Sequence, residues 1–159
     1  MNTQEQSYSF LDYIQEAIRT ESIVPLVAQP YSTEVRLIES RLLHSAIGLS
    51  TEAGELLDAL KKNIFYAKPL DLVNVEEEAG DLLWYLAILF DALKLNPYDV
   101  MRKNIAKLKA RYPQKFESEQ AITRDLAAER KILESKPTEE EVDAFINGRF
   151  SPVSEPNDK

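Results

Sequence analysis

The sequence contains no cysteine, only four glycines, a single histidine and a single tryptophan. Without cysteine the chain can form neither disulfide bonds nor a thiolate metal site. Acidic residues outnumber basic ones by 27 to 19, for a net charge of −8. This balance argues against general binding of nucleic acid, which requires a positive field. The longest apolar run, residues 82–90, is far shorter than the ~20 residues that span a bilayer.

The N-terminal residues also lack the basic segment followed by an apolar segment that is typical of a signal peptide. We therefore expect a cytoplasmic protein without a membrane segment. With 159 residues, 44% of them hydrophobic, the chain has enough apolar material for the core of one domain.

The most distinctive feature that is present is a short acidic motif, here called the acidic phrase, which occurs twice in the sequence. EAGE at residues 52–55 is followed by EAGD at residues 78–81, and each copy lies inside an apolar stretch that favours helix. A helix turns once in ~3.6 residues, so the two acids of each phrase share one face, one turn apart. Both phrases carry glycine at the same position, although glycine inside a helix costs ~1 kcal/mol relative to alanine. A residue without a side chain lets another helix, a metal shell or a phosphate approach closely.

Two such helices packed together would direct four carboxylates at one point. Carboxylates that share a semi-buried site repel one another unless hard cations hold them. The repeat therefore predicts a site for more than one Mg²⁺ ion, with a polyphosphate as its ligand. Taken singly, each phrase also fits an ordinary solvated helix face. The four predicted metal ligands are Glu52, Glu55, Glu78 and Asp81.

The rest of the pattern is helical, and no segment alternates with a period of two, so we predict an all-α fold. We expect helices over residues 9–22 and 32–66, with a bend at Gly48. A third helix, capped by Asp71 or Asn74, should carry the second acidic phrase. A fourth should begin with Asn96 as its N-cap and end before residue 113.

Several other polar side chains share a helical stripe with the acids or with one another. His44, Glu52, Glu55 and Lys62 fall on one stripe of the second expected helix, and Tyr85 follows Asp81 by four residues on the third. On the fourth helix an amide and two cations are spaced three and four residues apart, which suits the phosphate groups of a nucleotide. A solvated basic face is the alternative interpretation. These three residues are Asn104, Lys107 and Arg111.

Together these features resemble the MazG-like branch of the all-α nucleoside triphosphate pyrophosphohydrolases. That family is marked by ExxE, a spacer, ExxD, and then a helix reading approximately NxxKLxxRYPxKF. The corresponding segments here are residues 52–55, 78–81 and 104–116, and the resemblance covers about residues 37–116. One departure is Thr51, where many members carry a second acid directly before the first motif.

The resemblance implies hydrolysis of an NTP or dNTP from the nucleotide pool to the monophosphate and pyrophosphate. It implies that the four acids hold Mg²⁺, with Mn²⁺ as a substitute, and that Glu52 or Glu55 serves as the general base. Asn104, Lys107, Arg111 and Lys62 would contact phosphate or sugar, and His44 and Tyr85 are weaker candidates for the base pocket. It also implies a homodimer whose subunits together complete a four-helix catalytic core, and which could pair again into a homotetramer.

Three alternatives remain open from the sequence. A dimeric dUTPase-type enzyme shares the fold and the acidic motifs. A non-catalytic acidic helical dimerisation module would use the same acids only for solvation. A di-iron bundle is disfavoured because that class typically uses Glu-x-x-His pairs, and residue 41, three before His44, is arginine.

The expected organisation is a pyrophosphohydrolase domain over residues 1–116, a helical appendage over residues 117–150 and a disordered tail over residues 151–159. Within the appendage we expect one helix over residues 119–135. A second, short helix should be opened by a capping box at Thr138 and ended by Gly148.

Overall fold

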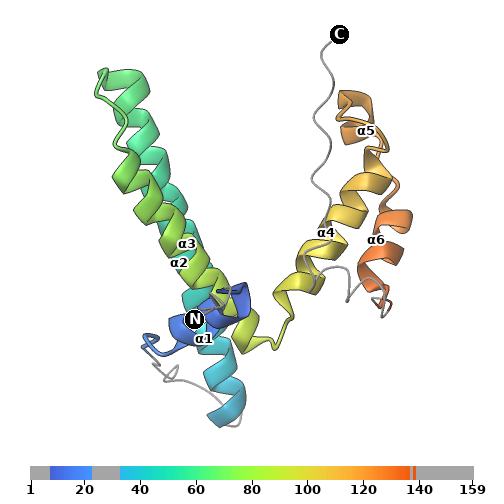
Figure 1. Cartoon of the computed structure of the whole chain (residues 1–159), viewed down its shortest axis with the longest axis horizontal. Helices are drawn as coiled ribbons and strands as arrows, with labels where there is room; N and C mark the ends of the chain where they lie inside the picture. Colours follow the sequence, from blue (N-terminus) through green and yellow to red (C-terminus); the bar gives the residue numbers. More distant parts are fainter. Residues whose placement is uncertain (1–7, 23–32, 137, 139–159) are drawn as a thin grey trace, which may run out of the picture. The chain divides into compact units, whose positions relative to one another are not determined.

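The computed structural model describes residues 8–22, 33–136 and 138. In this part of the chain all regular structure is helical, which confirms the predicted all-α class. The chain divides into two compact units, Met1–Leu95 and Asn96–Lys159, and each is described by itself. The helices are labelled in Figure 1 and are α1 (Phe10–Ile18), α2 (Thr33–Tyr66), α3 (Leu72–Ala92), α4 (Pro97–Arg111), α5 (Ser118–Ile122) and α6 (Leu126–Glu134).

The first unit is built on a long hairpin of α2 and α3, which lie side by side in Figure 1. Asp71 ends the connection between them as the N-cap of α3, and its side chain accepts hydrogen bonds from the backbone N–H groups of Val73 and Asn74. The two expected helices are thus confirmed, and of the two caps considered it is Asp71 that serves. The hairpin brings the two acidic phrases, which are distant in sequence, onto neighbouring helices.

The core of this unit lies where α1 packs on α3. Ile14 and Ala17 of α1 and Ala87 of α3 are buried there, and partly buried aromatic rings surround them. Among these rings is Trp84, whose indole N–H donates a hydrogen bond of 2.8 Å to the hydroxyl of Thr20. Trp84 is therefore a core residue in this chain, and its one polar atom is satisfied.

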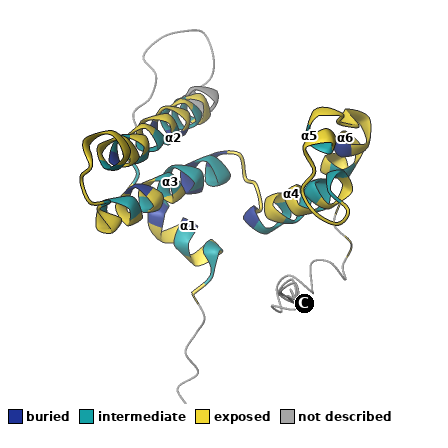
Figure 2. Cartoon of the chain, turned by 90° about the horizontal axis from the view of Figure 1, so that it is seen from above, coloured by how far each residue is buried: buried dark blue, intermediate teal, exposed yellow. Residues whose placement is uncertain are grey.

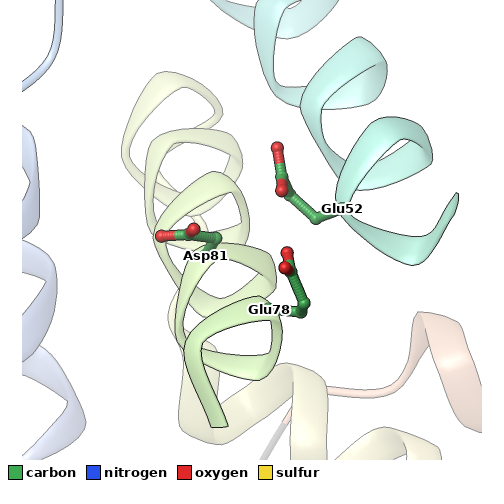
Figure 3. A group of neighbouring side chains, drawn as sticks. All are labelled: Glu52, Glu78 and Asp81. Atoms are coloured by element: carbon green, nitrogen blue, oxygen red, sulfur yellow. The ribbon is translucent and has the colours of Figure 1, made fainter. Parts of the chain in front are cut away.

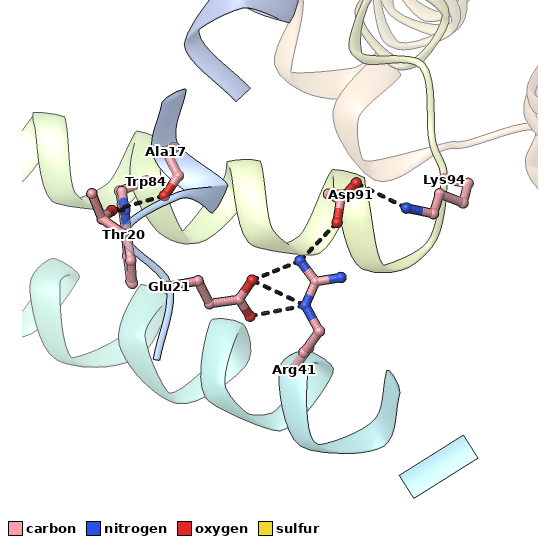
Figure 4. Close-up of polar contacts among 7 residues, drawn as sticks. All are labelled: Ala17, Thr20, Glu21, Arg41, Trp84, Asp91 and Lys94. Carbon is pink, nitrogen blue, oxygen red and sulfur yellow. Dashed lines mark hydrogen bonds and ion pairs between the residues drawn. The ribbon is translucent and has the colours of Figure 1, made fainter. Parts of the chain in front are cut away.

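The first helix is shorter than the expected range of residues 9–22. Ser9 caps it through a capping box with Asp12, but the helix ends at Ile18 and continues only as a turn. Beyond Ile18 the backbone makes the i, i+3 hydrogen bonds of a turn, and Glu21 then enters an ionic cluster, which is drawn in Figure 4. Arg41 of α2 bonds both carboxylate oxygens of Glu21 and also pairs with Asp91 of α3 at 2.7 Å. The cluster ties α1, α2 and α3 together.

The long helix expected over residues 32–66 is present as α2, which runs through Gly48 from Thr33 to Tyr66. Glycine is required there by packing: a Cβ at Gly48 would lie 2.1 Å from Cε1 of Tyr85. The backbone of α2 thus meets the ring of a residue on α3 directly. At Gly54 and Gly80 an added Cβ would have no group of another described segment within 4 Å, so packing among the described helices does not require those two glycines.

Much of the hairpin surface is exposed, as Figure 2 shows for α2. Several of the exposed side chains are large and apolar, although a single chain in water gains nothing by exposing them. They gather around the end of α2 and the start of α3 and include Leu57, Ile64, Phe65, Leu72 and Val73. None of the described helices is sufficiently long and apolar to cross a membrane.

The second unit begins as predicted with Asn96 capping α4, which ends at Arg111. The expected single helix over residues 119–135 is wrong: α5 ends at Ile122 and α6 begins at Leu126. Asp125 causes the break, because its side chain accepts the backbone N–H of Ala128 and so starts a new helix. The second unit is closed by packing of α6 on α4.

The predicted short helix from Thr138 to Gly148 and the tail over residues 151–159 lie outside the described residues, apart from Thr138 itself. The boundary expected at residue 116 differs from the division between the compact units after Leu95. The units follow contacts within the chain, so the functional boundary stays a prediction.

Candidate metal centre

Three acids from the two phrases meet between α2 and α3. Glu52 extends from α2, and Glu78 and Asp81 extend from successive turns of α3 (Figure 3). Each offers a carboxylate oxygen, and these oxygens all lie within 4.8 Å of one another. The i, i+3 spacing and the hairpin are together sufficient to produce this cluster.

Burial differs sharply among the three acids. Glu78 is buried, Glu52 is half-buried and Asp81 is exposed. Burial raises the pKa of Glu52, the hydrogen bond from Thr51 opposes that shift, and the negative charges of Glu55, Asp81 and Glu78 raise the pKa further. The charged form of Glu52 is thus disfavoured by its surroundings, as expected where carboxylates gather without a cation.

This donor set fits a hard divalent cation. Carboxylate oxygens are the ligands that Mg²⁺ prefers, and a cation among the three acids would remove their mutual repulsion. The absence of a nearby histidine or cysteine ligand in the described cluster leaves an all-oxygen site, which disfavours softer metals.

Glu55 lies outside this group of three oxygens and instead lines an open groove of about 490 Å³ beside it. The groove runs along α2 to the start of α3, and Glu78 belongs to both the groove and the cluster. Lys62 also lines the groove, but its ammonium is paired with Asp58 at 2.8 Å. The complete lining is Thr51, Gly54, Glu55, Asp58, Lys62, Asn74 and Glu78.

Three groove residues were not singled out by the sequence as site residues: Thr51, Asp58 and Asn74. Asp58 follows Glu55 by three residues, and Asn74 precedes Glu78 by four, so helical spacing alone places each beside a predicted ligand. Asn74 donates a hydrogen bond of 2.7 Å to Glu78. The spacing of Asn74 and Glu78 was visible in the sequence, but a role for Asn74 beside Glu78 could not be distinguished there from a role in capping α3.

The predicted base-pocket residues His44 and Tyr85 meet each other across the hairpin. Their ring centroids are 5.5 Å apart with nearly perpendicular planes, and Trp84 completes the cluster at 4.9 Å from Tyr85. Both residues are half-buried. Their role toward a base stays a prediction.

The N-terminal helix contributes a further contact to the second acidic phrase. The phenol of Tyr13 donates a hydrogen bond of 3.4 Å to the carbonyl oxygen of Gly80. Burial raises the pKa of Tyr13, and the negative charge of Asp81 adds to the shift. α1 thus supports the turn of α3 that carries Asp81.

The three predicted phosphate-binding residues of α4 lie in the second unit, and their surroundings differ. Asn104 is exposed. Arg111 is held by Glu129 of α6, with its side chain only 15% exposed, and Arg124 pairs with the same carboxylate. Lys107 is half-buried on the same helix.

In the described residues, the all-α fold brings three carboxylates together on a helical hairpin. Comparison with known families finds that residues 43–116 match the model of the MazG nucleotide pyrophosphohydrolase domain. The matched segment includes both acidic phrases and α4. Searches of curated proteins and of solved structures returned no match.

Proposed function

We propose that this protein is a Mg²⁺-dependent nucleoside triphosphate pyrophosphohydrolase that converts an NTP or dNTP to the monophosphate and pyrophosphate. One observation carries the proposal. Within the segment that matches the pyrophosphohydrolase family, Glu52, Glu78 and Asp81 offer oxygens within 4.8 Å of one another from two helices. A nucleotide pyrophosphohydrolase needs a cation site of this kind beside a space for its substrate.

In this proposal Glu52, Glu78 and Asp81 hold Mg²⁺, for which Mn²⁺ can substitute, and Glu55 faces the substrate in the adjoining groove. When bound, the ions neutralise phosphate charge and lower the pKa of a coordinated water. Glu52 is proposed as the proton acceptor, because burial and the neighbouring acids raise its pKa. Glu55 is the alternative acceptor.

The phosphate and sugar contacts are assigned to Lys62 in the groove and to Asn104, Lys107 and Arg111 on α4. Lys62 must exchange its partner Asp58 for a phosphate oxygen, and Arg111 must do the same with Glu129. His44 and Tyr85 are proposed to contact the base through their aromatic rings.

We further propose that the active form is a homodimer, which could pair again into a homotetramer. The exposed apolar residues at the end of α2 and the start of α3 support this, as does the open space beside the Cα atoms of Gly54 and Gly80, where an added Cβ would meet no other described group. A second copy that covers this surface would complete a four-helix core. Light scattering coupled to size exclusion measures the mass of the particle, and a strict monomer would contradict the proposal. We also propose that the protein acts on the nucleotide pool of the cytoplasm.

The test is to incubate the purified protein with Mg²⁺ and each common NTP and dNTP, including dUTP, and to separate the products by anion exchange. Monophosphate and pyrophosphate, both absent with Glu78→Gln, are the expected result. Glu77→Gln is the matched control, because Glu77 is exposed on the same turn and lies outside the cluster. Turnover of dUTP alone would favour the dUTPase-type activity. No turnover and no effect of Mg²⁺ would favour the dimerisation module.

A further inference from the structure

Glu78 is the most constrained acid of the cluster. It is only 4% exposed, so water cannot satisfy its carboxylate fully. A buried charge requires hydrogen-bond donors or a cation. The donor that the structure provides is the side-chain amide of Asn74, whose Nδ2 lies 2.7 Å from Oε1 of Glu78.

Asn74 is itself held in place by the start of α3. Its backbone N–H donates to the carboxylate of Asp71, the N-cap, at 3.3 Å. Glu78 follows one turn later, so the amide and the carboxylate share a face of the helix. Both side chains also line the groove. The contact therefore lies at the border between the groove and the acidic cluster.

The chemical nature of this donor matters. A lysine or arginine at position 74 would neutralise Glu78 and compete with a cation for it. An amide donates to one oxygen and leaves the negative charge of the carboxylate in place for a cation. Residues that orient ligands in this way commonly affect metal affinity ~10–100-fold.

The hydrogen bond to the carboxylate of Glu52 is less well defined than the one to Glu78. The hydroxyl of Thr51 lies 3.2 Å from Oε1 of Glu52 and 3.0 Å from the carbonyl oxygen of Gly48. A hydroxyl has one proton, so it can satisfy only one of these acceptors at a time. Asn74 and Glu78 thus provide the better-defined geometry at the cluster.

We propose that Asn74 is a positioning residue that orients the carboxylate of Glu78 toward a divalent cation. The inference rests on the proposed function, because it assumes that the cluster binds such an ion. Asn74 does not bind the ion in this account and acts only through Glu78. Its removal should weaken cation binding without removing a ligand.

The experiment is a Mn²⁺ titration of the full-length protein without nucleotide, followed by electron paramagnetic resonance of the free ion. We expect wild type to bind Mn²⁺, Glu78→Gln to lose most binding, and Asn74→Leu to bind about 10-fold or more weakly. Asn74→Gln, which keeps an amide, should recover part of the affinity. The matched control is Asn63→Ala, because the Asn63 amide donates to the carbonyl oxygen of Lys68 and does not touch the cluster.

The outcomes separate the two proposals. If wild type binds no Mn²⁺, the cation site fails and the proposed function fails with it. If wild type binds and Glu78→Gln does not, but folded Asn74→Leu or Asn74→Ala equals wild type, the role of Asn74 is overturned and the proposed function stands. Circular dichroism verifies that each variant retains its helices. A loss with Asn74→Leu that Asn74→Gln partly restores, and that Asn63→Ala does not reproduce, supports the role.

Discussion

Arg111 donates two hydrogen bonds to Glu129, from Nε to Oε1 at 2.8 Å and from Nη2 to Oε2 at 2.7 Å. This bidentate pair joins the end of α4 to α6, and Arg124 donates two further hydrogen bonds to the same carboxylate. A residue that the sequence predicts to contact phosphate thus holds the second unit together. Release of Arg111 to a substrate would therefore loosen the packing of α6 on α4.

The first prediction concerns the stability of this pair at low pH. Hydrogen bonds from Arg124 and Arg111 lower the pKa of Glu129 from an ordinary value of 4.5 to about 2. A lowered pKa in the folded state contributes stability that is present above pH 4.5 and is lost as pH falls toward 2. Wild type should lose more thermal stability across this window than Glu129→Gln does.

Calorimetry across that pH range measures the difference. Glu119→Gln is the control, because Glu119 is exposed on α5 and takes no part in the pair. It should follow the pH dependence of wild type. An identical pH dependence for wild type and Glu129→Gln would show that the ion pair does not contribute to stability.

The second prediction concerns Arg41. Arg41→Ala should leave Glu21, whose side chain is 1% exposed, as an uncompensated buried charge. The expected loss is about 3–5 kcal/mol in the free energy of unfolding, measured by urea denaturation. Arg19→Ala removes a pair with Glu16 in which both side chains are more than half exposed, and should cost less than about 1 kcal/mol. Equal effects of the two substitutions would contradict a structural role for the buried cluster.

The third prediction separates two glycines of α2. Gly48→Ala places a Cβ 2.1 Å from a ring atom of Tyr85, so the ring or the helix must shift, at a cost of about 1–3 kcal/mol in the free energy of unfolding. Gly54→Ala places a Cβ in space that no other described segment occupies and should stabilise α2 by up to about 1 kcal/mol. Urea denaturation of the two variants provides the comparison.

The ring of Tyr85 provides a further control for this prediction. The penalty of Gly48→Ala should shrink in a Tyr85→Leu background, where the ring is absent. If the penalty does not change, the loss of stability in Gly48→Ala does not come from contact with the Tyr85 ring. A stable but inactive Gly54→Ala would indicate that a ligand or a second subunit approaches that position.

The sequence was sufficient to predict the features that depend only on residues close together in the chain. The all-α class, the cap at Asn96 and the long helix that carries Glu52 all follow from periodicity and capping chemistry. The contact of Glu21, just beyond α1, with Arg41 could not be predicted, because the two residues are far apart in the chain. The break at Asp125 was a cap signal concealed within a charged segment.

In the candidate site, too, some features follow from local spacing and others depend on packing between distant segments. The i, i+3 spacing places Glu78 and Asp81 together, but the position of Glu55 depends on how α2 is rotated against α3. That rotation is set by packing, including the contact between Gly48 and Tyr85. The partner of Arg111 likewise depends on the fold of α6.

The fourth prediction concerns metal removal. Burial and neighbouring acids raise the pKa of Glu52, so its ionised form is disfavoured in the folded protein without a cation. Glu52→Gln should therefore melt at a higher temperature than wild type in EDTA near neutral pH. Mg²⁺ should raise the melting temperature of wild type and leave that of the variant nearly unchanged.

Differential scanning fluorimetry in EDTA and in Mg²⁺ supplies both comparisons for that prediction. Glu77→Gln, an exposed charge on α3, should respond to Mg²⁺ as wild type does. Equal responses of wild type and Glu52→Gln would remove Glu52 from the cation site.

The most direct test of the central proposal is hydrolysis of the preferred nucleotide in ¹⁸O-labelled water with Mg²⁺, followed by mass spectrometry of the products. Attack of water on the α-phosphorus, directed by Glu52, Glu78 and Asp81, predicts that the label enters the monophosphate and that pyrophosphate remains unlabelled. Label in pyrophosphate, or release of diphosphate and labelled inorganic phosphate, would contradict it.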